Sequence, residues 1–187
     1  MRFSTLLITA AVVVSANAAS IEKRGISRPV QQCFNRLYDA TSQLSIVQNA
    51  VDDFTKDSGY FAALGIQRKE KVLEGILRET NNFCCRKVTD NITSEEIDAG
   101  TDIITPLITS ATKVLKSLEL KKDDFDAIPL TTFLVVADIK NMDSLTGTLL
   151  DCVSHKAPKD HYATFRDLSH TLGDAFSSVR YKYGIQN

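Results

Sequence analysis

Apolar residues recur every three or four positions along most of the chain after residue 29, which is the spacing of one face of an α-helix. The first such stretch opens at Pro29, a residue favoured in the first turn of a helix, and ends near residues 56–59. The later stretches cover about residues 66–88, 93–118, 123–153 and 162–183. The β-prone segment 133–136 lies inside one of these periods, so the length of the period favours helix over strand.

The predicted helices are long and their connections short, a combination typical of bundles in which successive helices are antiparallel. Thr93 with Glu96 fits a capping box, so the third helix is expected to begin at Thr93 or at the next residue. Pro106 lies inside that helix and should kink or split it. The fourth helix is expected to begin either near residue 123 or only at Pro129. We therefore predict an all-α fold, an antiparallel bundle of four to five long helices.

The first 24 residues have the pattern of a secretory leader instead. Arg2 is basic, the apolar run 6–14 is too short to span a bilayer, and residues 16–18 offer the small-x-small pattern that signal peptidase recognises. The pair Lys23 and Arg24 predicts a second, dibasic cleavage, although two solvated charges near a terminus would look the same. The predicted divisions are a signal peptide over 1–18, a short pro-segment over 19–24 and a single helical-bundle domain over 25–187.

Charge argues against two classes of partner. The whole chain carries a formal charge of −1, and no stretch concentrates lysine and arginine as binding to nucleic acid or to an anionic membrane would require. No later segment has the apolar length of a membrane span, and the C-terminus lacks a lipid-anchor tail. We expect an extracellular, secreted protein with no membrane anchor, associated with a cell wall only non-covalently.

The predicted domain has four cysteines, Cys33, Cys84, Cys85 and Cys152. An even number in an oxidising compartment indicates disulfides, and three pairings are possible on paper. Adjacent helical residues point about 100° apart, so Cys84 and Cys85 can reach different neighbours. We predict that Cys33 and Cys152 each bond one of them and stabilise the bundle, the alternative being free buried thiols. A second modification is predicted at Asn91, which begins an N-glycosylation sequon between two helical patterns.

Sequence signatures of catalysis are missing. No nucleophile elbow, zinc-protease motif or phosphate-binding glycine loop occurs. His155, His161 and His170 show no facing pair, and the acidic residues Glu95 and Glu96 fit stabilisation of a helix N-terminus. We expect a protein that is not an enzyme and has neither a cofactor nor a metal site.

A bundle of long helices can also hold a ligand between them. Three polar residues, Thr41, Thr80 and Ser169, interrupt the apolar stripes. Their hydroxyls can bond back to their own helix, or one of them can anchor the polar head of a lipid in an apolar tunnel. The aromatic residues expected to form its wall are Phe34, Phe54, Phe133, Phe165 and Phe176.

The second half of the chain carries a family resemblance. Residues 108–125 read ITSATKVLKSLELKKDDF, and a Leu- and Asp-rich helix, the tetrad 157–160 (APKD) and a final helix ending at residues 181–183 (YKY) follow in that order. This order is similar to the fungal hydrophobic surface-binding protein A family, which overlaps with the cell wall galactomannoproteins. The resemblance extends over roughly residues 30–183. The four cysteines and the lack of a Ser/Thr-rich stalk depart from its usual pattern.

The resemblance implies a secreted, all-helical protein with one of two activities. One is adsorption to hydrophobic surfaces with recruitment of a secreted polyesterase, and the other is capture of fatty acids inside the bundle. Our leading hypothesis is a non-enzymatic binding protein for hydrophobic surfaces or fatty-acid-type lipids. Disulfides would limit opening of the bundle and so favour internal capture. The alternative is a secreted effector or cell-wall interaction protein that binds a macromolecule through its exterior.

Overall fold

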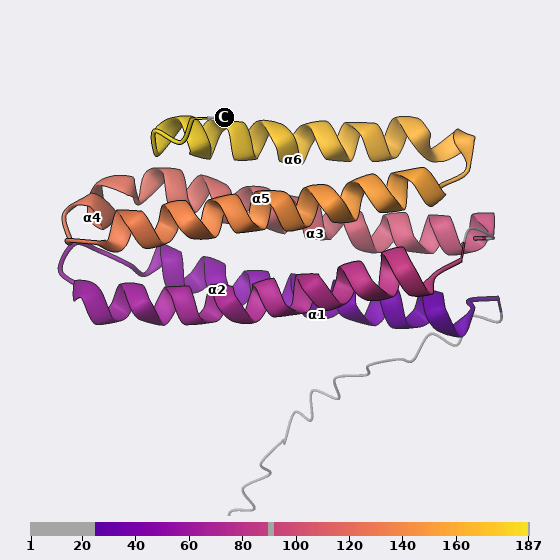
Figure 1. The fold of residues 1–187 in the computed structure, drawn as a ribbon, viewed down its shortest axis with the longest axis horizontal. Helices are drawn as coiled ribbons and strands as arrows, with labels where there is room; N and C mark the ends of the chain where they lie inside the picture. Colours follow the sequence, from indigo (N-terminus) through magenta and orange to yellow (C-terminus); the bar gives the residue numbers. More distant parts are fainter. Residues whose placement is uncertain (1–24, 90–91, 187) are drawn as a thin grey trace, which may run out of the picture.

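The computed structural model describes residues 25–89 and 92–186, and every regular element within them is helical (Figure 1). The elements are α1 (Arg28–Asp52), α2 (Gly59–Asn81), the π-helical turn η1 (Asn82–Lys87), α3 (Ser94–Leu120), α4 (Lys122–Asp126), α5 (Thr131–Lys156), the 3₁₀ turn η2 (Lys159–His161) and α6 (Tyr162–Lys182). The predicted signal peptide, pro-segment and glycosylation site at Asn91 lie outside the described residues.

The five long helices form a closed ring around a common centre. Helix α1 packs on α2 and α3, α2 packs on α5, α5 packs on α6, and α6 packs on α3. Successive long helices run in opposite directions, as predicted, so that α2 and α5 both begin at the end of the bundle where α1, α3 and α6 finish (Figure 1). The long helices turn an apolar face inward, and the buried residues of these faces form one continuous core.

Helix α3 confirms its predicted start and continues past Pro106. The Thr93 side chain accepts a hydrogen bond from the Glu96 backbone N–H (3.2 Å), and Glu96 Oε2 accepts one from the Thr93 backbone N–H (2.9 Å), which completes the capping box. Pro106, expected to kink or split the helix, does not split it. Both Pro106 and Asp102, whose carbonyl loses its helical partner, lie on the exposed face, where water can satisfy that carbonyl.

The two starts considered for the fourth helix both occur, as the separate helices α4 and α5. The chain turns between them at Leu130, which adopts a left-handed backbone conformation with φ 70°. The buried hydroxyl of Thr131 donates to the carbonyls of Phe125 and Ile128, the second at 2.9 Å. The Phe125 carbonyl also accepts from the Ile128 backbone N–H and the Ile128 carbonyl from the Thr131 backbone N–H, so the hydroxyl reinforces the turn from which α5 begins.

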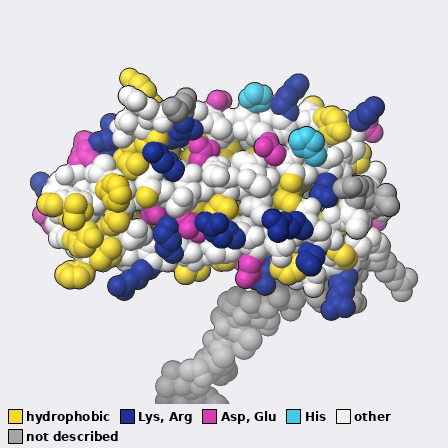
Figure 2. Space-filling view, viewed as in Figure 1, with side chains coloured by type: hydrophobic (Ala, Val, Ile, Leu, Met, Phe, Trp, Pro, Cys, Tyr) yellow, Lys and Arg dark blue, Asp and Glu magenta, His cyan; other side chains and the backbone are white. Residues whose placement is uncertain are grey.

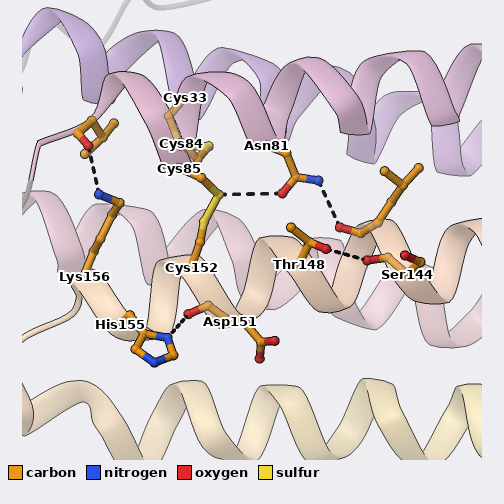
Figure 3. The surroundings of a disulfide bond; sticks show 12 residues. Cys33, Asn81, Cys84, Cys85, Ser144, Thr148, Asp151, Cys152, His155 and Lys156 are labelled. Carbon is orange, nitrogen blue, oxygen red and sulfur yellow. Dashed lines mark hydrogen bonds between the residues drawn. A yellow bond between two sulfur atoms is a disulfide. The ribbon is translucent and has the colours of Figure 1, made fainter.

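Two disulfides join three elements at one end of the bundle. Cys33 of α1 bonds Cys84 of η1, with Cα atoms 4.8 Å apart. Cys85 bonds Cys152 of α5, with Cα atoms 5.7 Å apart (Figure 3). Each adjacent cysteine therefore reaches a different helix, which is the pairing expected from the sequence. Polar bonds on either side of Cys85–Cys152 tighten this end: Asn81 Nδ2 donates to the Leu145 carbonyl (3.0 Å) and Lys156 Nζ donates to the Val88 carbonyl (3.0 Å) (Figure 3).

Candidate functional site

A cavity of about 80 Å³ lies at the centre of the ring of helices. All five long helices contribute to its wall, which is almost entirely aliphatic. The lining residues are Leu44, Val47, Val51, Ile66, Glu70, Leu73, Leu77, Ile104, Leu107, Ile108, Ala111, Val114, Leu115, Leu118, Val135, Asp138, Ile139, Met142, Thr146, Leu149, Leu150, Leu172 and Phe176. Glu70, Asp138 and Thr146 are the polar members of this set.

The cavity is narrow and long. Its volume exceeds the roughly 30 Å³ that one water molecule occupies in the liquid but falls below the roughly 300–1,000 Å³ of typical ligand pockets. Its lining on α5 extends from Val135 to Leu150, which at about 1.5 Å per residue is a length of about 22 Å. The structure therefore shows an elongated apolar seam that an extended chain could occupy if the helices moved apart.

A group of polar side chains interrupts this wall between α2 and α5. Glu70 is only 6% exposed and stands in the apolar stripe of α2, between Ile66 and Leu73. Lys71 Nζ lies 3.3 Å from Glu70 Oε2 and 3.2 Å from Asp138 Oδ1. It also donates a hydrogen bond of 2.6 Å to Glu74 Oε1. These ionisable side chains thus connect the cavity wall to the surface, where Lys71 is half-exposed.

The hydrogen bonding of this group is incomplete on the cavity side. Both oxygens of Glu70 and Oδ1 of Asp138 are buried and accept no hydrogen bond from a neighbouring donor, although a protonated Glu70 lies close enough to Asp138 to donate to it. Burial, followed by the nearby charges of Asp138 and Glu74, raises the pKa of Glu70 to about 8. Burial also raises the pKa of Asp138. Glu70 therefore carries a proton at neutral pH, which avoids an uncompensated buried charge.

Glu74 behaves differently because it faces hydrogen-bond donors. Burial alone would raise its pKa, but hydrogen bonds from Lys71 and from Asn141 Nδ2 (2.9 Å) lower that pKa overall. The Glu70, Glu74 and Asp138 carboxylates offer oxygens within 4.8 Å of one another, a donor set that suits a hard cation. The Lys71 ammonium already lies among these oxygens, so the group is better described as a buried ion-pair network than as a metal site.

Three of the five aromatic residues expected in a cavity wall line a cavity. Phe176 lines the central one. Phe34 and Phe165 line a second, smaller cavity of about 40 Å³ beside the Cys33–Cys84 bond. Phe54 is buried but lines neither, since its ring stacks on Phe125 with centroids 4.4 Å apart.

The prediction that the fifth residue, Phe133, lines the cavity wall is wrong. It is 73% exposed near the start of α5 rather than in the wall. The stripe of α5 that faces the cavity begins at Val135, and two residues correspond to about 200° of rotation around a helix. The sequence period identified the helix correctly, but Phe133 lies on its outer side.

The polar residues expected to hold a lipid head are placed elsewhere. Thr41 donates to the Leu37 carbonyl (3.0 Å) and Thr80 to the Ile76 carbonyl (2.8 Å), so both hydroxyls bond back within their own helix. Ser169 is half-buried on α6, and none of the three lines the central cavity. The polar residues of the central cavity, Glu70, Asp138 and Thr146, were not predicted from the sequence, and the first two are ionisable. The available signal was a carboxylate at a position where the helical period calls for an apolar residue.

Across residues 25–89 and 92–186, none of the helices combines the length and hydropathy that a membrane span requires. The sequence model of the family described as "Hydrophobic surface binding protein A" matches residues 30–155. No curated protein matches the chain.

Solved structures share the fold of this chain. AFMP4P in complex with palmitic acid superposes with a TM-score of 0.76 at 19% identity, over 82% of this chain and 99% of that one. Ligand binding domain 1 of the Penicillium marneffei MP1 protein, complexed with arachidonic acids, superposes with a TM-score of 0.74 at 15% identity, over 83% of this chain and 99% of that one. Ligand binding domain 2 of the same protein, complexed with multiple arachidonic acids, superposes with a TM-score of 0.75 at 14% identity, over 86% of this chain and 99% of that one. These likenesses establish a common bundle, and the match over residues 30–155 shows that the chain belongs to the hydrophobic surface binding protein A family.

Proposed function

We propose that this chain is a secreted, non-enzymatic binding protein that takes the hydrocarbon chain of a fatty-acid-type lipid into the central cavity. The observation that carries the proposal is the aliphatic seam enclosed by the ring of five helices. Proteins with the same fold have been solved with palmitic and arachidonic acids. Each methylene moved from water into such a seam contributes about 0.8 kcal/mol, so a long chain supplies a substantial driving force.

Uptake requires the seam to widen, and the positions of the disulfides favour one end for this. Cys33, Cys84, Cys85 and Cys152 tie together the end of the bundle where α1 begins. At the opposite end, where α2 and α5 begin, the described helices are joined by side-chain packing and by bonds such as that from Lys121 Nζ to the Phe54 carbonyl (2.7 Å). We expect the lipid to enter there.

A titration tests this proposal directly. Lipid-free protein, with its disulfides intact, is mixed with palmitic acid and examined by native mass spectrometry. The proposal requires a saturable adduct of defined stoichiometry. An unchanged mass at all concentrations below the solubility limit of the fatty acid would reject it. The same spectra report the mature N-terminus, which the leader sequence predicts to be Ala19 or Gly25.

Adsorption to hydrophobic surfaces is a second candidate, favoured by a separate observation. Apolar side chains gather at the end of the bundle where α2 and α5 begin (Figure 2). We call this the end patch, and its exposed members are Tyr60, Phe61, Leu130 and Phe133. Because α2 and α5 are packed parallel neighbours, these residues project from the same end. A cluster of exposed aromatic and aliphatic side chains is typical of a surface that contacts apolar material.

The proposal extends to two partners outside the bundle. A protein adsorbed through the end patch leaves its remaining faces free, on which a secreted polyesterase could dock or a cell wall could be contacted non-covalently. Co-sedimentation of a polyesterase with polyester particles, with and without this protein, tests the recruitment of the enzyme. Enzyme bound to the particles equally in both cases would remove recruitment from the proposed function.

A further inference from the structure

Binding of a hydrocarbon chain leaves one feature of the cavity unexplained. Two carboxyl groups, Glu70 and Asp138, stand in a wall that is otherwise aliphatic apart from Thr146. Three of their oxygens are buried without a hydrogen bond. Unsatisfied buried polar atoms cost free energy, so a wall built only to hold hydrocarbon would be more stable without them.

The charges that face Glu70 come from two helices. Lys71, Glu74 and Arg78 lie on α2, and Asp138 lies on α5. Lys71 Nζ is within 3.3 Å of all three carboxylates, and Arg78 Nη2 lies 3.9 Å from Glu74 Oε2. Two cations thus face three carboxyl groups, which leaves one negative charge without a counter-charge. A proton on Glu70 removes that excess and leaves the group neutral overall.

We propose that Glu70 and Asp138 form the head-group site of the cavity and that this site takes an uncharged, hydroxyl-bearing head in preference to an ionised carboxylate. The ligand class is a single-chain lipid ending in a neutral O–H, such as a long-chain alcohol or a fatty acid in its protonated form. This inference rests on the proposed lipid-binding function and specifies the head group that such a lipid carries.

The hydrogen-bonding capacity of the pair matches such a head. A ligand O–H donates to Oδ1 of Asp138, and its oxygen accepts from the protonated carboxyl of Glu70. Asp138 Oδ1 and one of the two Glu70 oxygens, two of the three buried atoms that lack a hydrogen bond, then gain a partner. The hydrocarbon chain follows the seam along α5 toward Leu149 and Leu150.

An ionised head group, by contrast, is disfavoured at this site. It would bring an uncompensated negative charge to a group that is neutral only while Glu70 keeps its proton. Lys71 is not free to neutralise it, because that ammonium is already shared among Glu70, Glu74 and Asp138. Drawing Lys71 toward the ligand would leave Asp138 as a buried, unpaired charge. The raised pKa of Glu70, caused first by burial, agrees with this reading.

The test compares equilibrium binding of radiolabelled 1-hexadecanol and palmitic acid to the full disulfide-bonded protein between pH 6.0 and 9.5. The alcohol does not titrate in this range, so its pH dependence reports the protein. We expect at least tenfold tighter binding of the alcohol than of palmitic acid at pH 7.5. We also expect the affinity for the alcohol to fall at least fivefold from pH 6.0 to 9.5.

Variants separate the head-group role from a structural one. Glu70→Gln keeps a neutral donor and should bind the alcohol with little pH dependence, whereas Glu79→Gln, on an exposed face of α2, should match the wild type. Asp138→Asn removes the second carboxylate and should tighten palmitic acid binding severalfold at pH 7.5. Palmitic acid bound as tightly as the alcohol, or affinity for the alcohol that does not change with pH, would overturn the head-group assignment alone. Binding of neither lipid would overturn the proposed function and this inference together.

Discussion

Cys85 and Cys152 are bonded across 67 residues of sequence and hold η1 against α5, while the neighbouring Cys84 is bonded to α1. This arrangement fixes three elements of the ring at one end and leaves the other end without a covalent tie among the described residues. The rigidity of the bundle is therefore expected to differ between its two ends. That difference bears directly on how the seam can open to admit a lipid.

Removal of the Cys85–Cys152 bond tests this asymmetry. The double variant Cys85→Ala/Cys152→Ala should lower the free energy of unfolding by about 2–4 kcal/mol, because the unfolded chain loses a loop constraint. Urea denaturation followed by far-UV circular dichroism measures the change. We expect the rate of lipid exchange to change little in this variant, because the lipid is proposed to enter at the opposite end of the bundle. Much faster lipid exchange would show that the disulfide-bonded end also opens.

Glu70 is expected to make stability depend on pH in an unusual direction. Its pKa in the folded protein, about 8, lies above the ordinary value of 4.5. The unfolded chain therefore releases a proton that the folded chain retains, and stability falls as pH rises from about 5 to 8, then levels off. Relative to Glu70→Gln, the wild type should lose roughly 2–4 kcal/mol over this window. Parallel stability curves for the two proteins would contradict the protonated state assigned to Glu70.

Glu96 joins two helix starts and should be costly to remove. Its carboxylate accepts hydrogen bonds from the backbone N–H groups of Thr93 (2.9 Å) and Ser27 (2.8 Å). Burial opposes ionisation, but these hydrogen bonds lower the pKa of Glu96 overall, so its contribution is present above pH 4.5 and lost as pH falls through the lower folded pKa. Glu96→Ala should reduce the free energy of unfolding by about 1–3 kcal/mol at pH 7. Glu95→Ala, in the same turn but exposed, is the matched control and should change it by less than about 0.5 kcal/mol.

A larger side chain in the seam should block lipid uptake. Ala111 lines the cavity from α3, so a phenylalanine at this position would occupy space that the hydrocarbon chain needs. We expect Ala111→Phe to reduce palmitic acid binding at least tenfold, as judged by native mass spectrometry, while the protein remains folded by circular dichroism. Ala163→Phe, on an exposed face of α6, should bind normally. Undiminished binding by Ala111→Phe would place the lipid outside the central cavity.

The end patch makes a separate prediction about adsorption. Phe61→Ser/Phe133→Ser removes its two most exposed aromatic rings, which are 85% and 73% exposed. Retention on alkyl-coated silica beads should fall several-fold, with lipid binding unchanged. Tyr162→Ser, at the start of α6 and so at the opposite end of the bundle, is the control. Equal retention of all three proteins would remove the end patch from the account.

Much of the fold could be predicted from the sequence because its signals are local. The apolar period specifies each long helix, Thr93 and Glu96 identify a helix start, and the adjacent positions of Cys84 and Cys85 restrict the disulfide pairing. These features depend on residues within a few turns of each other or on a small number of cysteines.

The candidate site depends on contacts between helices, which the spacing of apolar residues along the sequence does not reveal. Glu70 becomes part of a buried group only because α2 packs beside α5 and brings Asp138 to it, an arrangement set by the whole ring. Phe133 looked like a wall residue because the apolar positions near the start of α5 cover more than one face. The sequence therefore predicted the helical bundle, but the analysis of its apolar period did not single out Glu70 and Asp138, the carboxyl groups that line the cavity.

Whether the purified protein carries a lipid in the seam is the first measurement to make. Native mass spectrometry before and after organic extraction, with lipid analysis of the extract, provides it. We predict a mass excess, lost on extraction, that matches a single-chain lipid in near-stoichiometric amount. A protein that is secreted without bound lipid and gains none when 1-hexadecanol or palmitic acid is added would contradict this prediction.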